Sequence, residues 1–160
     1  MKRMKSSINP PKLKVRLARA ADLPALIQLY RELHAADPSY RSPSIAEMRK
    51  AFGAIRRNRD HRILIAEAEH QPIGSLHVLI FRHLGHGFRP AAVIENVVVA
   101  GAHRSKGIGE AMMAEADRIA RRHRCYKMSL TTNRRRTRAH RFYERLGWRR
   151  SHHGYSVCLN

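Results

Sequence analysis

The stretch "VIENVVVAGAHRSKGIGEAMMAEADRIARRH", residues 93–123, decides the fold. It joins an apolar, β-branched strand to an amphipathic helix through a basic loop that contains two glycines. The acidic residues of the helix come early and its arginines late, as the helix dipole prefers. Only the entry to the helix breaks this rule, because Arg104 and Lys106 lie where the dipole is already positive. This placement indicates that the loop binds an anion.

A helix N-terminus binds phosphate because its first N–H groups are unpaired and the dipole favours negative charge. Gly107 and Gly109 allow a close backbone approach, and Arg104 and Lys106 add charge-assisted hydrogen bonds. The glycine pattern alone is weak, since any basic loop with a tight turn resembles it. A Rossmann fingerprint needs a third glycine, and a P-loop ends in G-K-[ST]; neither is present.

The length and charge of the chain restrict its class. With 160 residues we expect one domain, over residues 13–160, preceded by a flexible basic arm over residues 1–12. Lys and Arg number 32 against 12 Asp and Glu, a formal net charge of +20. This charge predicts an anionic partner: a phosphorylated cosubstrate, an acidic substrate, nucleic acid or an anionic membrane surface.

Residues 1–14 lack the apolar segment typical of a secretory signal, and no apolar run approaches the roughly 18 to 20 residues that a membrane span needs. We therefore expect a cytoplasmic protein without a membrane span. Cys125 and Cys158 both lie in apolar, strand-like segments, and we expect them to be reduced and buried rather than catalytic.

Hydrophobic periodicity predicts a mixed α/β fold, in which helices pack on a sheet. Asp22 is the expected N-cap of the first helix. Val15 and Leu17 alternate with charged residues as in a half-buried strand. Strands are predicted at residues 14–20, 61–69, 72–81, 91–100, 125–132 and 151–160, and helices at 21–34, 44–57, 107–123 and 135–148.

The segment "RSKGIG", residues 104–109, resembles the R/Q-x-x-G-x-G/A motif of the GNAT superfamily of N-acetyltransferases, which binds the pyrophosphate of acetyl-CoA. Residues 15–33 and 72–78 resemble the first strand and helix and the third strand of that family. "NRRRTRAHRFYERLGW", residues 133–148, resembles its N-x-x-A-x-x-F-Y-x-x-L-G-F segment, with two extra residues and Trp148 in place of Phe. The implied fold is a central, mostly antiparallel sheet of six to seven strands flanked by about four helices.

The resemblance also implies roles for single residues. The backbone of Val97, Val98 and Val99 is expected to pair with the pantetheine arm. Asn133 is expected to bond the pantetheine or its neighbouring backbone, and Tyr143 to lie near the sulfur. The pyrophosphate is expected to be held by Arg104, Ser105, Lys106, Gly107, Ile108 and Gly109.

Acetyl transfer to an amine needs a proton acceptor, because an alkylamine with a pKa near ~10.4 is almost fully protonated at neutral pH. Glu95 is the best candidate, although a carboxylate with an ordinary pKa of ~4.3 needs burial or a water relay. The alternative is a structural carboxylate at a strand edge. A backbone N–H near Val97 is expected to bind the oxyanion, and Tyr143 to protonate the departing thiolate. The alternative for Tyr143 is a core aromatic beside Phe142 and Leu146.

Histidines and arginines outside these motifs suggest further contacts. The spacing of His, Cys and Asp does not match a zinc site, so no metal is expected. His83, His86 and Tyr40 are hypothetical lining residues of the acceptor pocket. An arginine run is most often a solvated helix face, but part of this one is expected beside the CoA 3′-phosphate or an acidic acceptor. The run comprises Arg134, Arg135, Arg136, Arg138 and Arg141.

The sequence thus predicts an acetyl-CoA-dependent N-acetyltransferase that acts by direct transfer in a ternary complex on a small-molecule or peptide amine. The alternative is a non-catalytic basic module that docks on RNA, the ribosome or another polyanion. A homodimer is expected from its frequency in the family, and nucleic-acid contact through the basic surface is a minor expectation.

Overall fold

The computed structural model describes residues 13–157 and residue 159. The predicted basic arm at residues 1–12 and the prediction for Cys158 lie outside the described residues.

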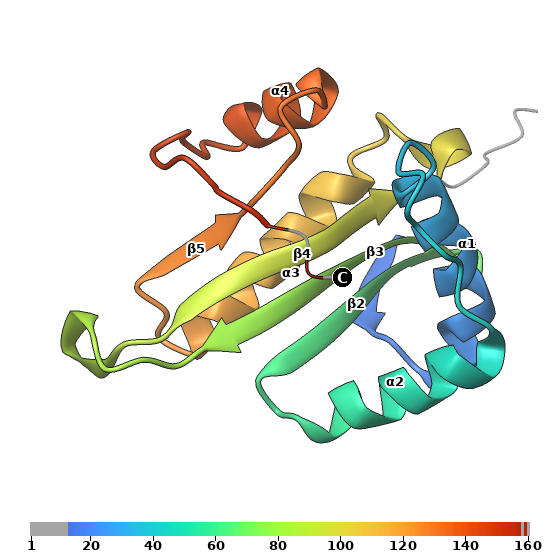
Figure 1. Ribbon diagram of the computed structural model, residues 1–160, viewed down its shortest axis with the longest axis horizontal. Helices are drawn as coiled ribbons and strands as arrows, with labels where there is room; N and C mark the ends of the chain where they lie inside the picture. Colours follow the sequence, from blue (N-terminus) through green and yellow to red (C-terminus); the bar gives the residue numbers. More distant parts are fainter. Residues whose placement is uncertain (1–12, 158, 160) are drawn as a thin grey trace, which may run out of the picture.

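The described residues form one five-stranded sheet and four α-helices (Figure 1). The sheet order is β1-β2-β3-β4-β5, and every pair is antiparallel except β4 and β5, which run parallel. The mixed α/β, mostly antiparallel fold is therefore confirmed, with five strands in the described part instead of six to seven. The elements in chain order are β1 (Lys14–Leu17), α1 (Leu23–Leu33), α2 (Ile45–Arg57), β2 (His61–Ala68), β3 (Gln71–Phe81), β4 (Ala91–Val99), α3 (Ile108–Arg122), β5 (Lys127–Leu130) and α4 (Thr137–Arg145).

Helices cover both faces of the sheet (Figure 1). The apolar stripe of α3 is buried against one face, as its spacing of three and four residues predicts. α1 and α2 cover the other face, where Leu26 and Phe52 pack on Ile65 of β2. No helix within residues 13–157 combines the length and apolar character that crossing a membrane requires.

Polar contacts fix the entry to α1 differently from the prediction. The Asp22 carboxylate does not cap the helix; it accepts hydrogen bonds from the Arg19 N–H at 2.7 Å and from the Arg16 guanidinium at 2.7 and 2.8 Å. Arg16 also pairs with Glu67 of β2. Val15 packs against the core, whereas Leu17, at the end of β1, is 54% exposed instead of half-buried.

The predicted final strand is wrong for the described residues. Residues 148–157 have no strand partner, and Tyr155 and Val157 are 98% and 81% exposed. The alternation of apolar residues there is typical of a strand, but a strand also needs a neighbouring edge with which to pair. The tail makes no such pairing.

Two irregularities of β4 shape the region around it. β4 carries one extra residue opposite β3, because Glu95 pairs with His77 but Val98 already pairs with Ser75. Asn96, inside this bulge, has a φ of +53°. The parallel pairing with β5 ends at Ile94, so within the described residues the β5-facing edge of β4 is unpaired from Glu95 onward.

Candidate active site

A cavity of about 950 Å³ lies where β4 ends and α3 begins, with α4 across from them; we call it the α3 cavity. It combines an apolar wall from β4 with a strongly basic wall from α4. The residues that line it include Glu32, Leu33, Val97, Val98, Val99, His103, Arg104, Ser105, Gly107, Ile108, Gly109, Glu110, Arg135, Arg136, Thr137, Arg138, Ala139, Arg141, Phe142, Tyr143 and Arg145.

The N-terminus of α3 opens into this cavity without a capping side chain. Two residues of the preceding loop are left-handed, Ser105 with a φ of +61° and Gly107 with a φ of +76°. Turns of this kind direct backbone N–H groups toward a common point and bind anions. Gly109 is required for close packing, since a Cβ there would lie 3.0 Å from Cζ of Phe142. The loop therefore presents uncapped N–H groups to an anion.

The two cations of the loop lie differently from the prediction. The Arg104 guanidinium donates to the Val99 carbonyl at 3.0 Å and approaches the Glu32 carboxylate at 3.5 Å. Glu32 also accepts from the Gly101 N–H at 2.9 Å. The Lys106 ammonium donates to the Ala102 carbonyl at 3.1 Å, and Lys106 is not among the residues named as lining the cavity. Arg104 thus lies at the cavity, tied to α1 and β4, whereas Lys106 braces the loop from outside.

β4 brings three predicted residues to one wall of the cavity, namely Val97, Val98 and Val99. This segment directly follows the bulge and lies where β4 has lost β5 as a neighbour. Its free edge offers backbone donors and acceptors to an extended ligand, in the way that a sheet edge accepts an added strand.

Tyr143 lines the same cavity and also packs against the core. Its ring lies 5.0 Å from that of Phe142 and 6.0 Å from that of Trp148, measured between centroids. Burial raises the pKa of the Tyr143 phenol, the positive charge of Arg136 lowers it, and the negative charge of Glu95 raises it further. The two predicted catalytic residues thus lie close enough to interact electrostatically.

Glu95 is exposed on β4, on the face of the sheet that α1 and α2 partly cover. The Glu95 side chain is therefore open to water. The residue directly opposite it on β3 is His77.

Asn133 is not among the residues named as lining the cavity. Its side-chain oxygen accepts from the Arg135 N–H at 2.9 Å, and its carbonyl accepts from the Arg136 N–H at 2.9 Å. These bonds shape the turn in front of α4. In this structure Asn133 builds the turn that carries Arg136 and makes no wall of the α3 cavity.

Sequence reasoning missed part of this wall. Glu32 and Leu33, at the end of α1, line the cavity although they are about 70 residues away from the loop in sequence, so no local pattern marked them. The arginine run did carry a signal: Arg135, Arg136, Arg138 and Arg141 all line the cavity.

The three hypothetical lining residues of the acceptor pocket are not among those that line the α3 cavity, and their assignment stays a prediction. His83 and His86 belong to the β3–β4 loop, at the opposite end of β4, where His86 stacks on Tyr126 with centroids 3.9 Å apart. Tyr40 stacks on His34 with centroids 4.5 Å apart, and its hydroxyl is buried without a hydrogen-bond partner among the described residues.

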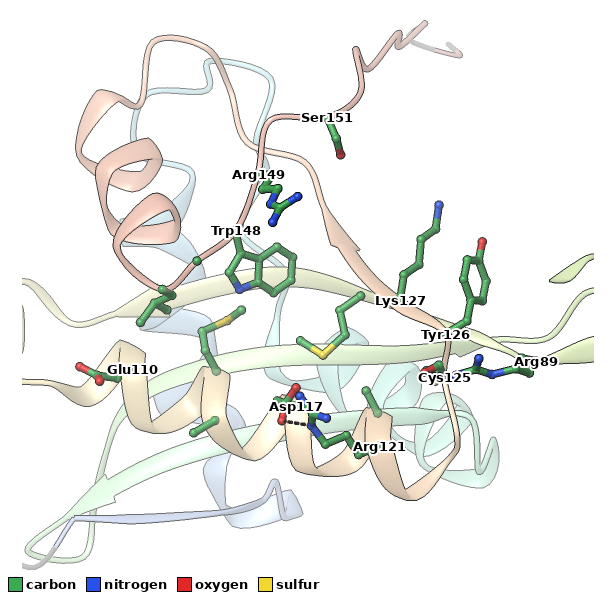
Figure 2. A pocket seen from close by; sticks show the side chains of 16 residues that line it. Arg89, Glu110, Asp117, Arg121, Cys125, Tyr126, Lys127, Trp148, Arg149 and Ser151 are labelled. Atoms are coloured by element: carbon green, nitrogen blue, oxygen red, sulfur yellow. Dashed lines mark hydrogen bonds and ion pairs between the residues drawn. The ribbon is translucent and has the colours of Figure 1, made fainter.

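A second cavity, of about 790 Å³, lies between α3, β5 and the chain after α4; we call it the β5 cavity (Figure 2). Its wall includes Met128 and Trp148. Asp117 and Arg121, one turn apart on α3, also line it and form an ion pair of 2.6 Å. Cys125 lies there too, and burial raises the pKa of its thiol. This cavity contains neither the basic loop nor the Glu95–Tyr143 pair, and its thiol stays protonated at neutral pH.

Within the part of the chain that the structure describes, no three His, Cys, Asp or Glu side chains gather as a metal site would require. The prediction of no metal stays a prediction.

The sequence is similar to a known protein family and to a characterised relative. The family model described as "Acetyltransferase (GNAT) family" matches residues 23–148. A relative, the glucosamine 6-phosphate N-acetyltransferase of Trypanosoma brucei brucei, is 28% identical over 139 residues, which are 86% of this chain and 89% of the relative.

Solved structures share the fold. A putative acetyltransferase from Agrobacterium tumefaciens str. C58 aligns with a TM-score of 0.84 and 32% identity, over 91% of this chain and 99% of that one. A glucosamine-6-phosphate N-acetyltransferase from Arabidopsis thaliana aligns with a TM-score of 0.81 over 93% of this chain and 99% of that one; at 24% identity it shows a likeness of fold alone.

Proposed function

The chain belongs to the GNAT acetyltransferase family and is an acetyltransferase enzyme, and we propose that it transfers the acetyl group of acetyl-CoA to a primary amine by direct attack in a ternary complex. The observation that carries this proposal is the α3 cavity. It joins an uncapped, basic helix N-terminus, the free edge of β4 and Tyr143 in one site. Glu95 is not among the residues that line the cavity, but its negative charge acts on the Tyr143 phenol.

The residues of the cavity fit a coenzyme A thioester. The uncapped N–H groups from Ile108 to Glu110 suit the pyrophosphate. Arg138 and Arg141 of α4 suit the 3′-phosphate, because guanidinium groups bond phosphate in a bidentate manner. The free edge at Val97–Val99 suits the amide groups of the pantetheine arm.

In the proposed mechanism Glu95 removes the proton of the attacking amine. Because the carboxylate is exposed, a bound water between it and the nitrogen carries the proton. The amine nitrogen then forms a bond to the acetyl carbon, and the backbone N–H of Val97, displaced by the bulge, is the proposed donor to the oxyanion.

Tyr143 completes the reaction as the proton donor to the sulfur. When the carbon–sulfur bond breaks, the sulfur receives the bonding pair, and the phenol supplies a proton or a strong hydrogen bond. Arg136 lowers the pKa of this phenol against the effect of burial, which makes it a better acid. The proposed mechanism is direct transfer without a covalent acetyl-enzyme; the thiol of Cys125, the cysteine among the described residues, lies in the β5 cavity and not beside Tyr143.

We propose that the acceptor is an amine that also carries a negative charge. The chain has a net charge of +20, and the α3 cavity is lined by six arginines, so a polycationic amine would be repelled. Glucosamine 6-phosphate, which the name of the Trypanosoma relative specifies, has both groups and is the first acceptor to test.

The non-catalytic binding module that the sequence left open is not favoured, because the family match and the relative are enzymes. The comparisons lend no support to the expected homodimer or to nucleic-acid contact, and neither is part of the proposal.

The test is an assay of thiol release from acetyl-CoA across a panel of amines, with glucosamine 6-phosphate first and a polyamine for comparison. We expect turnover with the anionic amine and little with the polyamine. Absence of acetyl-CoA consumption with every amine, together with absence of acetyl-CoA binding in calorimetry, would refute the proposed function.

Two variants separate binding from chemistry. Tyr143→Phe is expected to bind acetyl-CoA as the unmodified protein does and to turn over about 100-fold more slowly. Glu95→Gln is expected to turn over more slowly by a similar factor. The difference in rate from the unmodified protein should become smaller at high pH, where the free amine becomes abundant. Full turnover by Tyr143→Phe would remove this residue from the mechanism.

A further inference from the structure

Two histidines that the proposed mechanism does not use form a hydrogen-bonded pair on the sheet. Nδ1 of His61, at the start of β2, lies 3.0 Å from Nε2 of His77, in the middle of β3. Their ring centroids are 5.0 Å apart. Both rings are half-buried. We call them the histidine pair.

The histidine pair lies beside the proposed base. His77 is directly opposite Glu95 in the antiparallel ladder between β3 and β4, so the two side chains are on the same face of the sheet. Cβ atoms of such partners are about 5 Å apart. His61, His77 and Glu95 occupy three neighbouring strands and form an oblique row, because the β2 residue directly opposite His77 is Ile63 and His61 reaches His77 diagonally.

We propose that the histidine pair carries the proton of the acceptor amine from Glu95 to solvent. The proposal rests on the proposed function. Glu95 is exposed in the free protein. In the proposed complex the reacting amine covers this carboxylate, so the carboxylate needs another route by which its proton reaches solvent. A second exit along the row of side chains then returns the carboxylate to its basic form.

The transfer moves protons from one group to the next and leaves both histidine rings neutral. The amine proton on the Glu95 carboxylate passes, directly or through one water, to Nδ1 of His77. The proton on Nε2 of His77 moves to Nδ1 of His61, and the proton on Nε2 of His61 passes to water. Only O–H and N–H bonds break and form. Both rings return to their first tautomers by exchange with water after the products leave.

The surroundings keep His77 neutral between transfers. Burial, and the neighbouring charge of His61 when that ring is protonated, lower the pKa of His77 to about 4. Other charged groups nearby are already paired. Asp60, next to His61, binds Arg82 at 3.2 Å, and Arg62 donates to the His61 carbonyl at 2.8 Å. Tyr30 of α1 packs over this face, and burial raises the pKa of its phenol. Glu95, directly opposite His77 on β4, is the group proposed to exchange a proton with it.

The first test needs no substrate. Nitrogen-15 NMR of the imidazoles in the full chain reports the tautomer and pKa of each ring. We expect His77 to stay neutral down to about pH 4 and to share a proton with His61. A His77 ring that titrates near ~6.5, as a free histidine does, or that shares no proton with His61, would overturn the proposal.

The second test is kinetic, with acetyl-CoA and glucosamine 6-phosphate as probes. His61→Gln and His77→Gln should each lower kcat about tenfold without changing the affinity for acetyl-CoA. Because a relay acts as a unit, the double variant should be no slower than either single one. Added imidazole should restore part of the rate of His61→Ala. The matched control is His153→Gln, an exposed histidine of the tail, which should have the unmodified rate.

Other results contradict the relay. A higher KM for the amine with an unchanged kcat would make the histidine pair an acceptor-binding site instead. Additive losses in the double variant would show two independent structural effects. If the probe amine is not turned over at all, the acceptor assignment fails, and the NMR titration then decides the relay by itself.

Discussion

At the scale of single residues, the α3 cavity depends on two glycines for different reasons. Gly107 has a φ of +76° and open space around it, so it is needed for its backbone conformation. Gly109 is needed for space, because a Cβ would lie 3.0 Å from Phe142. Both glycines were predicted to belong to the anion loop. The structure adds that Gly107 is needed for its left-handed backbone and Gly109 for the close contact with Phe142.

The two glycines form a matched pair of variants. Gly109→Ala should displace the Phe142 ring and with it α4, which weakens acetyl-CoA binding by about tenfold. Gly107→Ala should cost about 1 kcal/mol of unfolding free energy from left-handed strain, with a smaller effect on binding. Calorimetry and thermal unfolding measure the two effects. Equal binding by Gly109→Ala would show that α4 is not held in place by this contact.

A second residue-scale prediction concerns Arg16. Its hydrogen bonds are the largest cause of the lowered pKa values of Asp22 and Glu67. Arg16→Met leaves both carboxylates without their partner and should lower Tm by about 5 °C at pH 7.

The pH dependence of this change has a definite sign. A lowered pKa in the folded state stabilises the fold above the unfolded pKa, here ~3.9 for Asp22 and ~4.3 for Glu67, and this contribution is lost as pH falls through the folded values. The difference in Tm between the two proteins should therefore be full at pH 7 and shrink toward pH 3. A difference that stays constant over this range would assign the effect to packing of the arginine stem.

At the scale of elements, the bulge in β4 sets the orientation of the residues proposed to act in catalysis. It shifts the residues after Asn96 by one position against β3, which turns Val97 and Val98 relative to Glu95. Asn96 tolerates a φ of +53° better than most residues, whereas a β-branched residue does not.

Asn96→Val should therefore destabilise the fold by about 1–2 kcal/mol and reduce kcat, because the strain is relieved by reshaping the bulge. Asn96→Gly is the control, since glycine adopts this conformation freely. Denaturant unfolding and the thiol-release assay measure both effects. An Asn96→Val protein with full activity would show that the position of the oxyanion donor does not depend on the bulge.

Elements differed in how far the sequence predicted them. α3 was predicted almost to the residue, because its apolar stripe, early acids and late arginines all indicate the same helix. The bulge was not predicted, since its φ depends on pairing with a strand that is distant in sequence. The predicted strand at 151–160 failed for a related reason: alternation indicates a surface that fits a sheet, but not whether an edge is free to accept it.

At the scale of the whole molecule, the net charge is +20, and six arginines line the α3 cavity. The sequence predicted an anionic partner and an arginine run, but not that four of its arginines share a cavity with Glu32 of α1. That arrangement results from tertiary contacts, such as the hydrogen bond from Arg136 to the Leu33 carbonyl.

This charge predicts binding that weakens with salt. The affinity for acetyl-CoA should fall roughly tenfold between ~50 mM and ~500 mM salt, because exposed arginines are screened. Arg138→Gln with Arg141→Gln should lower the affinity at low salt and flatten the dependence. Arg118→Gln is the control, as this arginine pairs with Glu115 on the outer face of α3. An unchanged salt dependence in the double variant would exclude these arginines from phosphate binding.

The most direct test of the account is a crystal structure of the protein with acetyl-CoA. We predict the pyrophosphate at the N–H groups of Ile108 to Glu110, the pantetheine along Val97–Val99, and the sulfur within hydrogen-bond reach of the Tyr143 hydroxyl. Coenzyme bound in the β5 cavity, or an α3 N-terminus without phosphate at saturating ligand, would contradict it.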